Sequence, residues 1–367
     1  MSRRRTDGQK RVRIWMVVNV FLLGSLTALV MHTSSRLDAA TANAATGQGS
    51  ATAGPAINVP GDAALPANIP SKAQITAVSG KYFGVAAPGM PWSSNAGSQI
   101  AQTAGTPPDM VEYFVNWTQD FSVVPVQDAY AQGMLPVLTW EPSPGGNART
   151  TQVDFPEYKL STIIDGSHDA YITKFADAVR DAKWVVAIRF AHEMNGSWYP
   201  WCEGVNGNTT GQYAQAWRHV HDIFSREHAD NVIWIWAPNI IRSAKTPLKE
   251  LYPGDAYVDW VGLSAYDVTE RTAAQLVDPT RQLIRKFTAK PMLITEIGSQ
   301  PSSFKAAWTA DFLTWLPKQN DVIGFIWFEY TRAEGAGTDW GFDADTSTLA
   351  SFRLGIQPLK FVVLPLQ

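Results

Sequence analysis

Short apolar runs recur along the chain from Lys81 onward, and helical patterns or long loops separate them. Runs of this length, bounded by polar or turn residues, are typical of buried strands. Eight such runs lie at residues 82–87, 111–117, 135–140, 184–191, 232–236, 260–265, 292–295 and 323–328. Buried strands that alternate with helices indicate an α/β protein with a parallel sheet, and eight of them predict a (β/α)8 TIM barrel.

Apolar stripes at helical spacing mark several of the expected helices. The stripes are Tyr171, Phe175 and Val179; Tyr213, Trp217, Val220 and Phe224; and Phe304, Trp308, Phe312 and Trp315. Such stripes are typical of helix faces that pack against a core. Thr209, with Gln212 three residues later, predicts a capping box at the start of the second helix. Helices are poorly marked in the second and third units, and only a short helix is expected near residues 349–353.

The amino-terminal part of the chain has a different pattern. Positions 3–13 are rich in basic residues, and an apolar run follows at residues 14–31. This order predicts an export signal or an uncleaved membrane anchor over residues 1–33. Residues 34–75 are rich in Ala, Thr, Gly and Pro, which predicts a flexible linker before a catalytic barrel at residues 76–367. The barrel is therefore expected outside the cytoplasm, either membrane-anchored or secreted.

Composition narrows the class of protein. With 45% apolar and 17% charged residues, the chain is typical of a globular protein, and its net charge of −3 gives no basic footprint for nucleic acid. The only cysteine, Cys202, rules out an intrachain disulfide and is expected to be a small buried residue. The 15 tryptophans are unusual. Because aromatic rings stack on the apolar faces of sugars, a carbohydrate is a candidate ligand. We expect the protein to be a monomer.

Carboxylates follow five of the predicted strands, at the end of the barrel where active sites lie. They are Glu141, Glu193, Asp267, Glu296 and Glu329. Glycoside hydrolysis requires two carboxyl groups, one to protonate the leaving oxygen and one to attack the anomeric carbon or activate water. Glu193 and Glu296 end wholly apolar strands, where an unpaired charge is costly, and are therefore the better pair. Glu141 and Glu329 are alternatively structural partners of Arg189, Arg332 or a loop amide.

Several segments carry a more specific pattern. Residues 189–201 read Arg-Phe-Ala-His-Glu-Met-Asn-Gly-Ser-Trp-Tyr-Pro-Trp, and residues 294–298 read Ile-Thr-Glu-Ile-Gly. Between them lie Asn-Val-Ile-Trp-Ile-Trp-Ala-Pro-Asn at 231–239, Tyr-Pro-Gly-Asp at 252–255, and Val-Gly-Leu at 261–263 before Tyr266. In this order, over roughly residues 80–350, these segments resemble glycoside hydrolase family 26.

The resemblance implies a retaining (β/α)8 hydrolase that acts on β-linked polysaccharides without a metal or other cofactor. Glu193 would be the general acid/base and Glu296 the nucleophile, with His192 orienting the acid and Tyr266 bonded to the nucleophile. Trp327 would form the floor under the cleaved sugar, and Trp198 and Trp201 would line neighbouring subsites. Other candidate substrate-binding residues at strand ends are Asn116, Trp140, Glu141 and Asn195.

The substrate stays open at this point. The Tyr199-Pro200-Trp201 stretch and the Thr-Trp-Glu-Pro stretch at 139–142 look more like members acting on mixed-linkage β-glucan than like mannan-cleaving members. We therefore expect endo-acting cleavage of mixed-linkage β-glucan, or of mannan or glucomannan.

Two other classes of function are weighed against hydrolysis by carboxyl groups. A metal-dependent hydrolase would need histidines at strand ends, but His192 is the only one so placed, and His219 and His221 point to different faces of a helix. Asp343 and Asp345 are a weak candidate for a structural calcium site. The second hypothesis for function is a non-catalytic sugar-binding barrel in cell-surface polysaccharide attachment or export.

Overall fold

The computed structural model describes residues 65–66, 68–145, 153–243 and 246–366. The predicted export segment and most of the predicted linker lie outside these residues. Within the part of the chain that the structure describes, none of the helices combines the length and the apolar character that crossing a bilayer demands.

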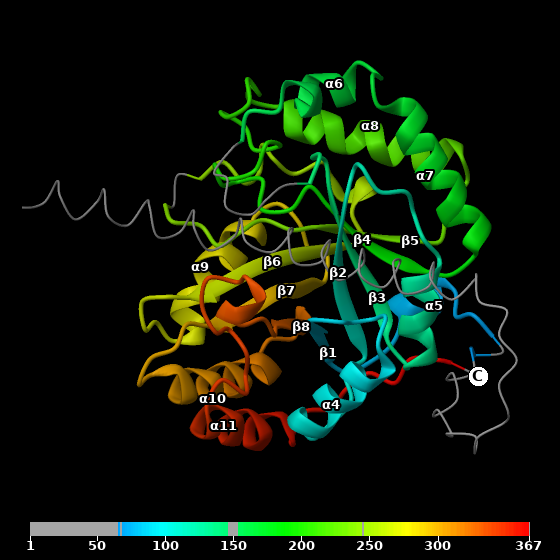
Figure 1. Cartoon of the computed structure of the whole chain (residues 1–367). Helices are drawn as coiled ribbons and strands as arrows, with labels where there is room; N and C mark the ends of the chain where they lie inside the picture. Colours follow the sequence, from blue (N-terminus) through cyan, green and yellow to red (C-terminus); the bar gives the residue numbers. More distant parts are fainter. Residues whose placement is uncertain (1–64, 67, 146–152, 244–245, 367) are drawn as a thin grey trace, which may run out of the picture.

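Eight parallel strands close into a barrel in sequence order (Figure 1). They are β1 (Tyr82–Ala86), β2 (Met110–Asn116), β3 (Leu135–Glu141), β4 (Val186–Phe190), β5 (Val232–Trp236), β6 (Trp260–Asp267), β7 (Met292–Ser299) and β8 (Val322–Phe328). The prediction of a (β/α)8 TIM barrel is confirmed. The closing pair is β1 and β8, where Tyr82 lies beside Gly324. A Cβ at residue 324 would be 2.4 Å from the Tyr82 carbonyl oxygen, so the two strands can approach only because this residue is glycine.

An outer layer of helices covers the barrel (Figure 1). Its helices are α4 (Ser94–Ala104), α5 (Val124–Ala131), α6 (Leu160–Ile164), α7 (Asp169–Ala182), α8 (Gln212–Arg226), α9 (Ala273–Ile284), α10 (Lys305–Trp315) and α11 (Thr346–Ile356). The predicted stripes are the inner faces of α7, α8 and α10, where Phe175, Trp217 and Trp308 are buried. Between β5 and β6 the described residues form only the 3-10 turn η2 (Asp255–Tyr257).

The start of α8 differs from the predicted capping box. Its N-cap is Gly211, with φ of 88°, rather than Thr209. Only half of the predicted box forms, since the Thr209 N–H donates to Gln212 Oε1 at 2.7 Å. A distant side chain takes the capping role: Glu203 Oε1 accepts the backbone N–H groups of Gly211 at 2.8 Å and Tyr213 at 3.1 Å. The prediction was wrong because this carboxylate competes for the free N–H groups of the helix.

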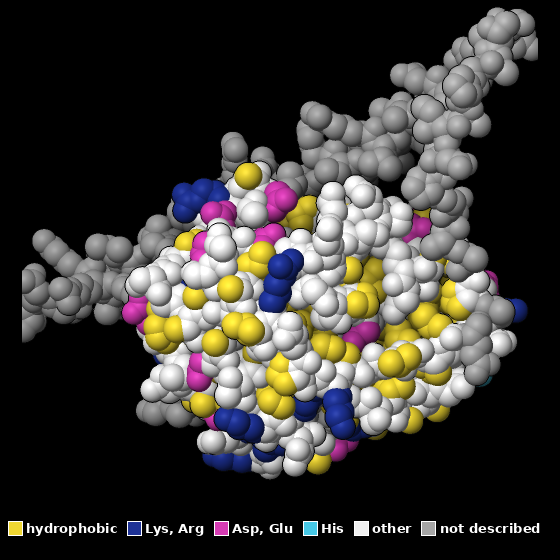
Figure 2. Space-filling model, turned by 90° about the horizontal axis from the view of Figure 1, so that it is seen from below, with side chains coloured by type: hydrophobic (Ala, Val, Ile, Leu, Met, Phe, Trp, Pro, Cys, Tyr) yellow, Lys and Arg dark blue, Asp and Glu magenta, His cyan; other side chains and the backbone are white. Residues whose placement is uncertain are grey.

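The surface of the helix layer carries charges of both signs. On the face shown in Figure 2, lysine and arginine side chains alternate with aspartate and glutamate among polar and scattered apolar groups. This face has no extended basic field of the kind that binds nucleic acid.

Both ends of the described chain lie at the amino-terminal end of the barrel. The short helix α3 (Lys72–Thr76) falls inside the predicted linker, yet its Ile75 is fully buried and the Tyr82 hydroxyl donates to the Ile75 carbonyl at 3.0 Å. Packed structure therefore begins before residue 76. Near the other end, Phe361 forms a bridge with Lys81, just before β1.

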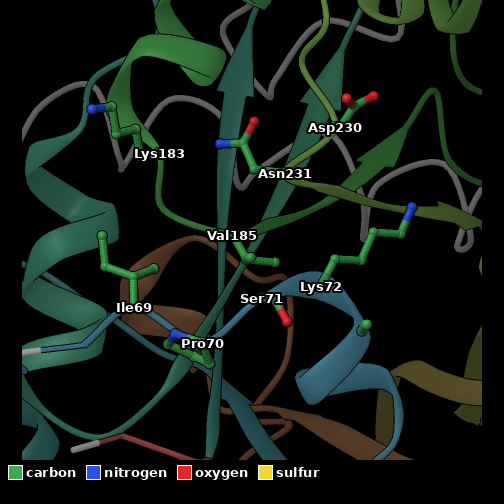
Figure 3. A pocket seen from close by; sticks show the side chains of 9 residues that line it. Ile69, Pro70, Ser71, Lys72, Lys183, Val185, Asp230 and Asn231 are labelled. Atoms are coloured by element: carbon green, nitrogen blue, oxygen red, sulfur yellow. The ribbon is translucent and has the colours of Figure 1, made fainter.

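A cavity of about 510 Å³ adjoins α3 (Figure 3). Ser71 and Lys72 line it together with Lys183, Val185 and Asn231, which precede β4 and β5. Because these residues lie where the strands start, the cavity is at the opposite end of the barrel from the predicted catalytic glutamates.

Candidate active site

A fully buried arginine lies at the centre of the predicted site. Arg189, on β4, donates from Nη1 to Glu112 Oε1 on β2 at 3.0 Å and to Glu296 Oε1 on β7. Its Nη2 donates to Ser264 Oγ on β6 at 2.6 Å. Interior layers of such barrels are usually dominated by branched apolar side chains. Arg189 Nη1 also donates to Thr139 Oγ1 on β3 at 3.4 Å, so one buried guanidinium joins β4 to β2, β3, β6 and β7.

The carboxyl group of Glu296 receives a donor on each oxygen. Arg189 donates to Oε1, and the Tyr266 hydroxyl donates to Oε2. The expected hydrogen bond from Tyr266 is therefore present. Burial and the neighbouring Glu296 raise the pKa of Tyr266, so its hydroxyl keeps the proton that it donates. Donors of this kind stabilise a carboxylate over a carboxylic acid.

Glu193 follows β4 in a strained backbone conformation. Its φ is 54°, in the left-handed region that non-glycine residues rarely adopt. The Glu193 N–H donates to the Ala237 carbonyl at 2.7 Å, which holds this conformation. On the side chain, Oε1 accepts from Asn239 Nδ2 and Oε2 from Trp198 Nε1, both at 2.8 Å. The position of this carboxyl is thus fixed by the loops after β4 and β5.

The surroundings of Glu193 favour its protonated form. Burial, and then the charge of Glu296, raise the pKa of Glu193, while Arg189 opposes the shift. Burial also raises the pKa of Glu112 and Glu141 to about 8 each. Four buried carboxyl groups therefore face one guanidinium. With pKa values of about 8, Glu112 and Glu141 favour their protonated forms near neutral pH.

His192 lies beside the acid as a neutral imidazole. Burial and the charge of Arg189 hold its pKa well below the ordinary value. Its Nε2 is hydrogen-bonded to the Tyr199 hydroxyl at 3.0 Å, and its carbonyl accepts from Trp201 Nε1 at 2.6 Å. Trp201 is only 1% exposed and stacks beneath Tyr199, with ring centroids 4.4 Å apart. The structure thus corrects its predicted place along a subsite: Trp201 supports Tyr199 and His192.

Two further tryptophans point away from the site. Trp140 stacks on Phe175 of α7 with centroids 4.3 Å apart, and Trp327 packs against Phe312 of α10 and Phe352 of α11. Both are fully buried between barrel and helices. Side chains alternate along a strand, so the inward face of β3 carries Thr139 and Glu141 instead. The predictions that Trp327 forms the sugar floor and that Trp140 binds substrate are therefore wrong.

The predicted amides hold loops. Asn116 Oδ1 accepts the Thr118 N–H at 2.9 Å and so closes the turn after β2. Asn195 clamps the loop after β4 to the one after β5, because its side chain bonds both the carbonyl and the N–H of Asn239, each at 2.8 Å. By contrast, the carboxyl of Glu141 is only 3% exposed, and burial is the largest cause of its raised pKa.

Glu329 and Asp345 hold the framework around the last strand and helix. Glu329 Oε2 accepts the Phe342 N–H at 2.9 Å, which makes it the partner of a loop amide. Asp345 caps α11 through the N–H groups of Ser347 and Thr348, both at 2.9 Å. Over the described ranges, no three His, Cys, Asp or Glu side chains are grouped as metal ligands, so the calcium candidate at Asp343 and Asp345 is not supported.

Sequence reasoning missed part of the polar centre. Glu112 was not singled out, although it interrupts the apolar strand from Met110 to Phe114. A single charged residue inside a buried strand predicts a functional or structural role, because a buried charge needs an oppositely charged or hydrogen-bonding partner. Ser264 and Tyr199 gave no comparable signal, since a hydroxyl is common in any strand or loop.

Asn239→Ala is expected to move the basic limb of the pH dependence of kcat/KM to higher pH. The Asn239 side chain lowers the pKa of Glu193, so its removal raises that pKa. A general acid must be protonated, and it would then stay active further into the basic range. Activity at the optimum should fall by less than about tenfold, since one hydrogen bond contributes ~1 kcal/mol. Asn208→Ala is the matched control, because it removes a buried amide of the loop after β4 that donates to the carbonyls of Pro200 and Cys202. An unmoved limb in Asn239→Ala would contradict the assignment.

The sequence and the fold of this chain are similar to those of known glycoside hydrolases. The model of "Glycosyl hydrolase family 26" matches residues 72–322. Endoglucanase H of Acetivibrio thermocellus is 32% identical over 278 residues, which are 72% of this chain and 29% of that protein. Mannan endo-1,4-beta-mannosidase A and B of Caldalkalibacillus mannanilyticus is 26% identical over 271 residues, 64% of this chain and 49% of that protein. The chain thus spans half or less of the length of these curated relatives.

Solved structures share the fold. A family 26 β-mannanase from Bacteroides ovatus aligns with a TM-score of 0.59 and 19% identity over 79% of this chain and 92% of its own. A modular endo-β-1,4-mannanase from Cellulomonas fimi aligns with a TM-score of 0.60 and 18% identity over 79% of this chain and 75% of its own. The family match extends from α3 to the start of β8 and includes both Glu193 and Glu296. On this basis, the chain belongs to glycosyl hydrolase family 26.

Proposed function

We propose that this protein is a retaining endo-β-glycanase that cleaves β-1,4 bonds in a polysaccharide such as mixed-linkage β-glucan, mannan or glucomannan. The observation that carries the proposal is the contrast between two buried carboxyls of one centre. Glu296 accepts from Arg189 and Tyr266, whereas burial and Glu296 raise the pKa of Glu193. One group is thereby suited to attack and the other to donate a proton.

The reaction follows in two displacements. Glu296 attacks the anomeric carbon while the bond to the leaving oxygen breaks and Glu193 gives that oxygen its proton. A covalent glycosyl ester on Glu296 results. Glu193, now a carboxylate, takes a proton from water, and the water oxygen replaces Glu296 at the anomeric carbon. Trp198 and Asn239, both bonded to Glu193, keep this carboxyl in place through both steps.

Glucan is the first substrate to test. The relative with 32% identity is named an endoglucanase, whereas relatives named mannan endo-1,4-beta-mannosidases are 26% to 31% identical. The Tyr199-Pro200-Trp201 stretch supports the same choice. We further propose that the protein works outside the cytoplasm, which rests on the basic and apolar pattern of residues 1–33.

The first product of hydrolysis is expected to keep the β configuration. Two successive displacements at one carbon restore its stereochemistry. Proton NMR of a short β-glucan oligosaccharide, recorded within the first minutes before mutarotation, measures the anomer released. An initial α product would overturn the nucleophile role of Glu296. Binding of β-glucan, glucomannan, mannan and xylan without release of reducing ends would instead support a sugar-binding barrel.

A further inference from the structure

One nitrogen of the buried arginine is shared between two carboxyl groups. Arg189 Nη1 donates to Glu112 Oε1 at 3.0 Å and also to Oε1 of Glu296, the proposed nucleophile. The side chains of Arg189 and Glu112 are fully buried, and that of Glu296 is 2% exposed. Neither displacement uses Glu112 directly. Because the donor is shared, however, a group that holds or moves Arg189 also affects the nucleophile.

The two carboxyl groups differ in how their oxygens are hydrogen-bonded. Glu296 receives a donor on each oxygen, from Arg189 on Oε1 and from the Tyr266 hydroxyl on Oε2. Arg189 and the Thr139 hydroxyl both donate to the same oxygen of Glu112, Oε1. Within the described part of the chain, Glu112 Oε2 is buried and has no hydrogen-bond partner. A carboxylate at this position would carry part of its charge on an oxygen without a donor, which is costly in a buried site, whereas a proton on Oε2 removes that charge.

The charged and titratable groups around Glu112 favour the same form. Burial is the largest cause that raises its pKa to about 8; the charge of Arg189 opposes the shift, and that of Glu296 adds to it. The titratable groups that interact with it come from β3, β4, β6, β7 and the end of β8: Glu141, Arg189, Tyr266, Glu296 and Tyr330. Among these five groups only Arg189 is a cation. The hydrogen bonds and the electrostatics therefore agree on a protonated Glu112 below about pH 8.

We propose that Glu112 is a positioning residue that holds Arg189 as an uncharged carboxylic acid and leaves the charge of the guanidinium to Glu296. A protonated carboxyl group still accepts hydrogen bonds, so Oε1 can orient the guanidinium without competing for its charge. Charge-assisted hydrogen bonds are stronger than neutral ones, so this division favours the carboxylate that attacks the sugar. The inference rests on the proposed hydrolase function and adds to it a residue that acts through Arg189.

Infrared difference spectroscopy of the native protein and Glu112→Gln, at about pH 6, tests the protonation state directly. Glutamine has the shape of a protonated glutamate and the same acceptor oxygen, so the variant should keep the hydrogen bonds from Arg189 and Thr139. The native-minus-variant spectrum should show the C=O band of a carboxylic acid, and this band should be lost as the pH rises through about 8. A carboxylate band at about pH 6 would overturn the inference, whether or not the protein hydrolyses any glycan.

Kinetics test the positioning role. Glu112→Ala removes the acceptor and should lower kcat on β-glucan by about 100-fold, because a misplaced Arg189 no longer orients the nucleophile. KM should stay within about twofold, since Glu112 is only 1% exposed. Glu112→Gln should restore kcat to within about fivefold of the native value. The comparison of Glu112→Gln with the native enzyme does not depend on whether Glu112→Ala folds.

Asp109→Ala is the matched control, because Asp109 is also a buried carboxyl next to β2. It lies at the other end of that strand, where its Oδ1 accepts the Phe83 N–H at 3.0 Å. Both alanine variants should lose stability in urea, but only Glu112→Ala should lose kcat. Equal kcat values in the two alanine variants, or a kcat of Glu112→Gln as low as that of Glu112→Ala, would overturn the inference and leave the hydrolase function standing. Absence of hydrolysis by the native enzyme would instead count against the hydrolase function, while the infrared spectra would still decide the protonation state of Glu112.

Discussion

Glu296→Ala is expected to reduce kcat by about 10⁴-fold or more, because no other group can form the glycosyl ester. Reducing-end release from β-glucan measures the loss. Azide supplies a sharper readout, since it is small enough to replace a missing carboxylate. With Glu296→Ala, azide attacks the anomeric carbon directly and yields the α-glycosyl azide. With Glu193→Ala, the ester still forms and azide replaces water, which yields the β-glycosyl azide.

Glu329→Gln is the control for this experiment, because Glu329 is also a buried strand-end glutamate, but it accepts the loop amide of Phe342. Its kcat should stay within about tenfold of the native value. Circular dichroism of each variant checks that the barrel forms. Near-native turnover by Glu296→Ala, or the same azide anomer from both variants, would contradict the assigned roles.

Arg189→Met is expected to lower the free energy of unfolding by about 3–5 kcal/mol at pH 8. The change leaves the carboxyls of Glu112 and Glu296 buried without their cation, and breaking a buried ion pair at one side costs about this much. Urea unfolding followed by tryptophan fluorescence measures the difference. The variant should also lose activity, since Glu296 then depends on Tyr266 alone for orientation.

The sign of the pH dependence follows from the raised pKa values. Glu112 and Glu141 have pKa values of about 8 in the folded protein, above those of an unfolded chain. The folded state therefore holds protons that the unfolded state releases, and stability falls as pH rises from about 4 through 8. Without Arg189 these groups are still harder to ionise, so the variant should lose more stability than the native protein over this range.

Arg285→Met provides the comparison, because Arg285 is partly exposed and its partner Asp321 keeps Arg281. Its cost should be about 1 kcal/mol or less. Equal losses for Arg189→Met and Arg285→Met, or a larger loss for Arg189→Met at pH 5 than at pH 8, would show that Arg189 does not hold the carboxyl centre together.

The barrel could be predicted from sequence because each strand is a predominantly apolar run. In an apolar run, however, the sequence does not show whether a side chain points into the barrel or towards the helices. Trp140 and Trp327 lie in strands that are buried on both faces, where both faces carry apolar residues and the alternation of period two is weak. Strand ends were easier to identify: Glu193 and Glu296 stand at the boundary between an apolar run and a loop.

Contacts between distant segments could not be predicted in the same way. The cap of α8 comes from Glu203, which lies outside any local capping pattern. The burial of Trp201 depends on how the loop after β4 folds back so that its indole bonds the His192 carbonyl. The spacing of apolar residues in the sequence does not predict how this loop folds back. Glu112 is the exception, since its charge within an apolar strand required a buried partner that only the folded barrel identifies as Arg189.

The placement of α3 and of residue 361 at the amino-terminal end of the strands has a practical consequence. A solid support, a fusion partner or a lipid surface attached through residue 65 or residue 366 would meet the face that carries the cavity beside Lys72. The face with Glu193 and Glu296 would point outward. A long polymer could then be cut along its length without its ends ever reaching the surface to which the enzyme is fixed.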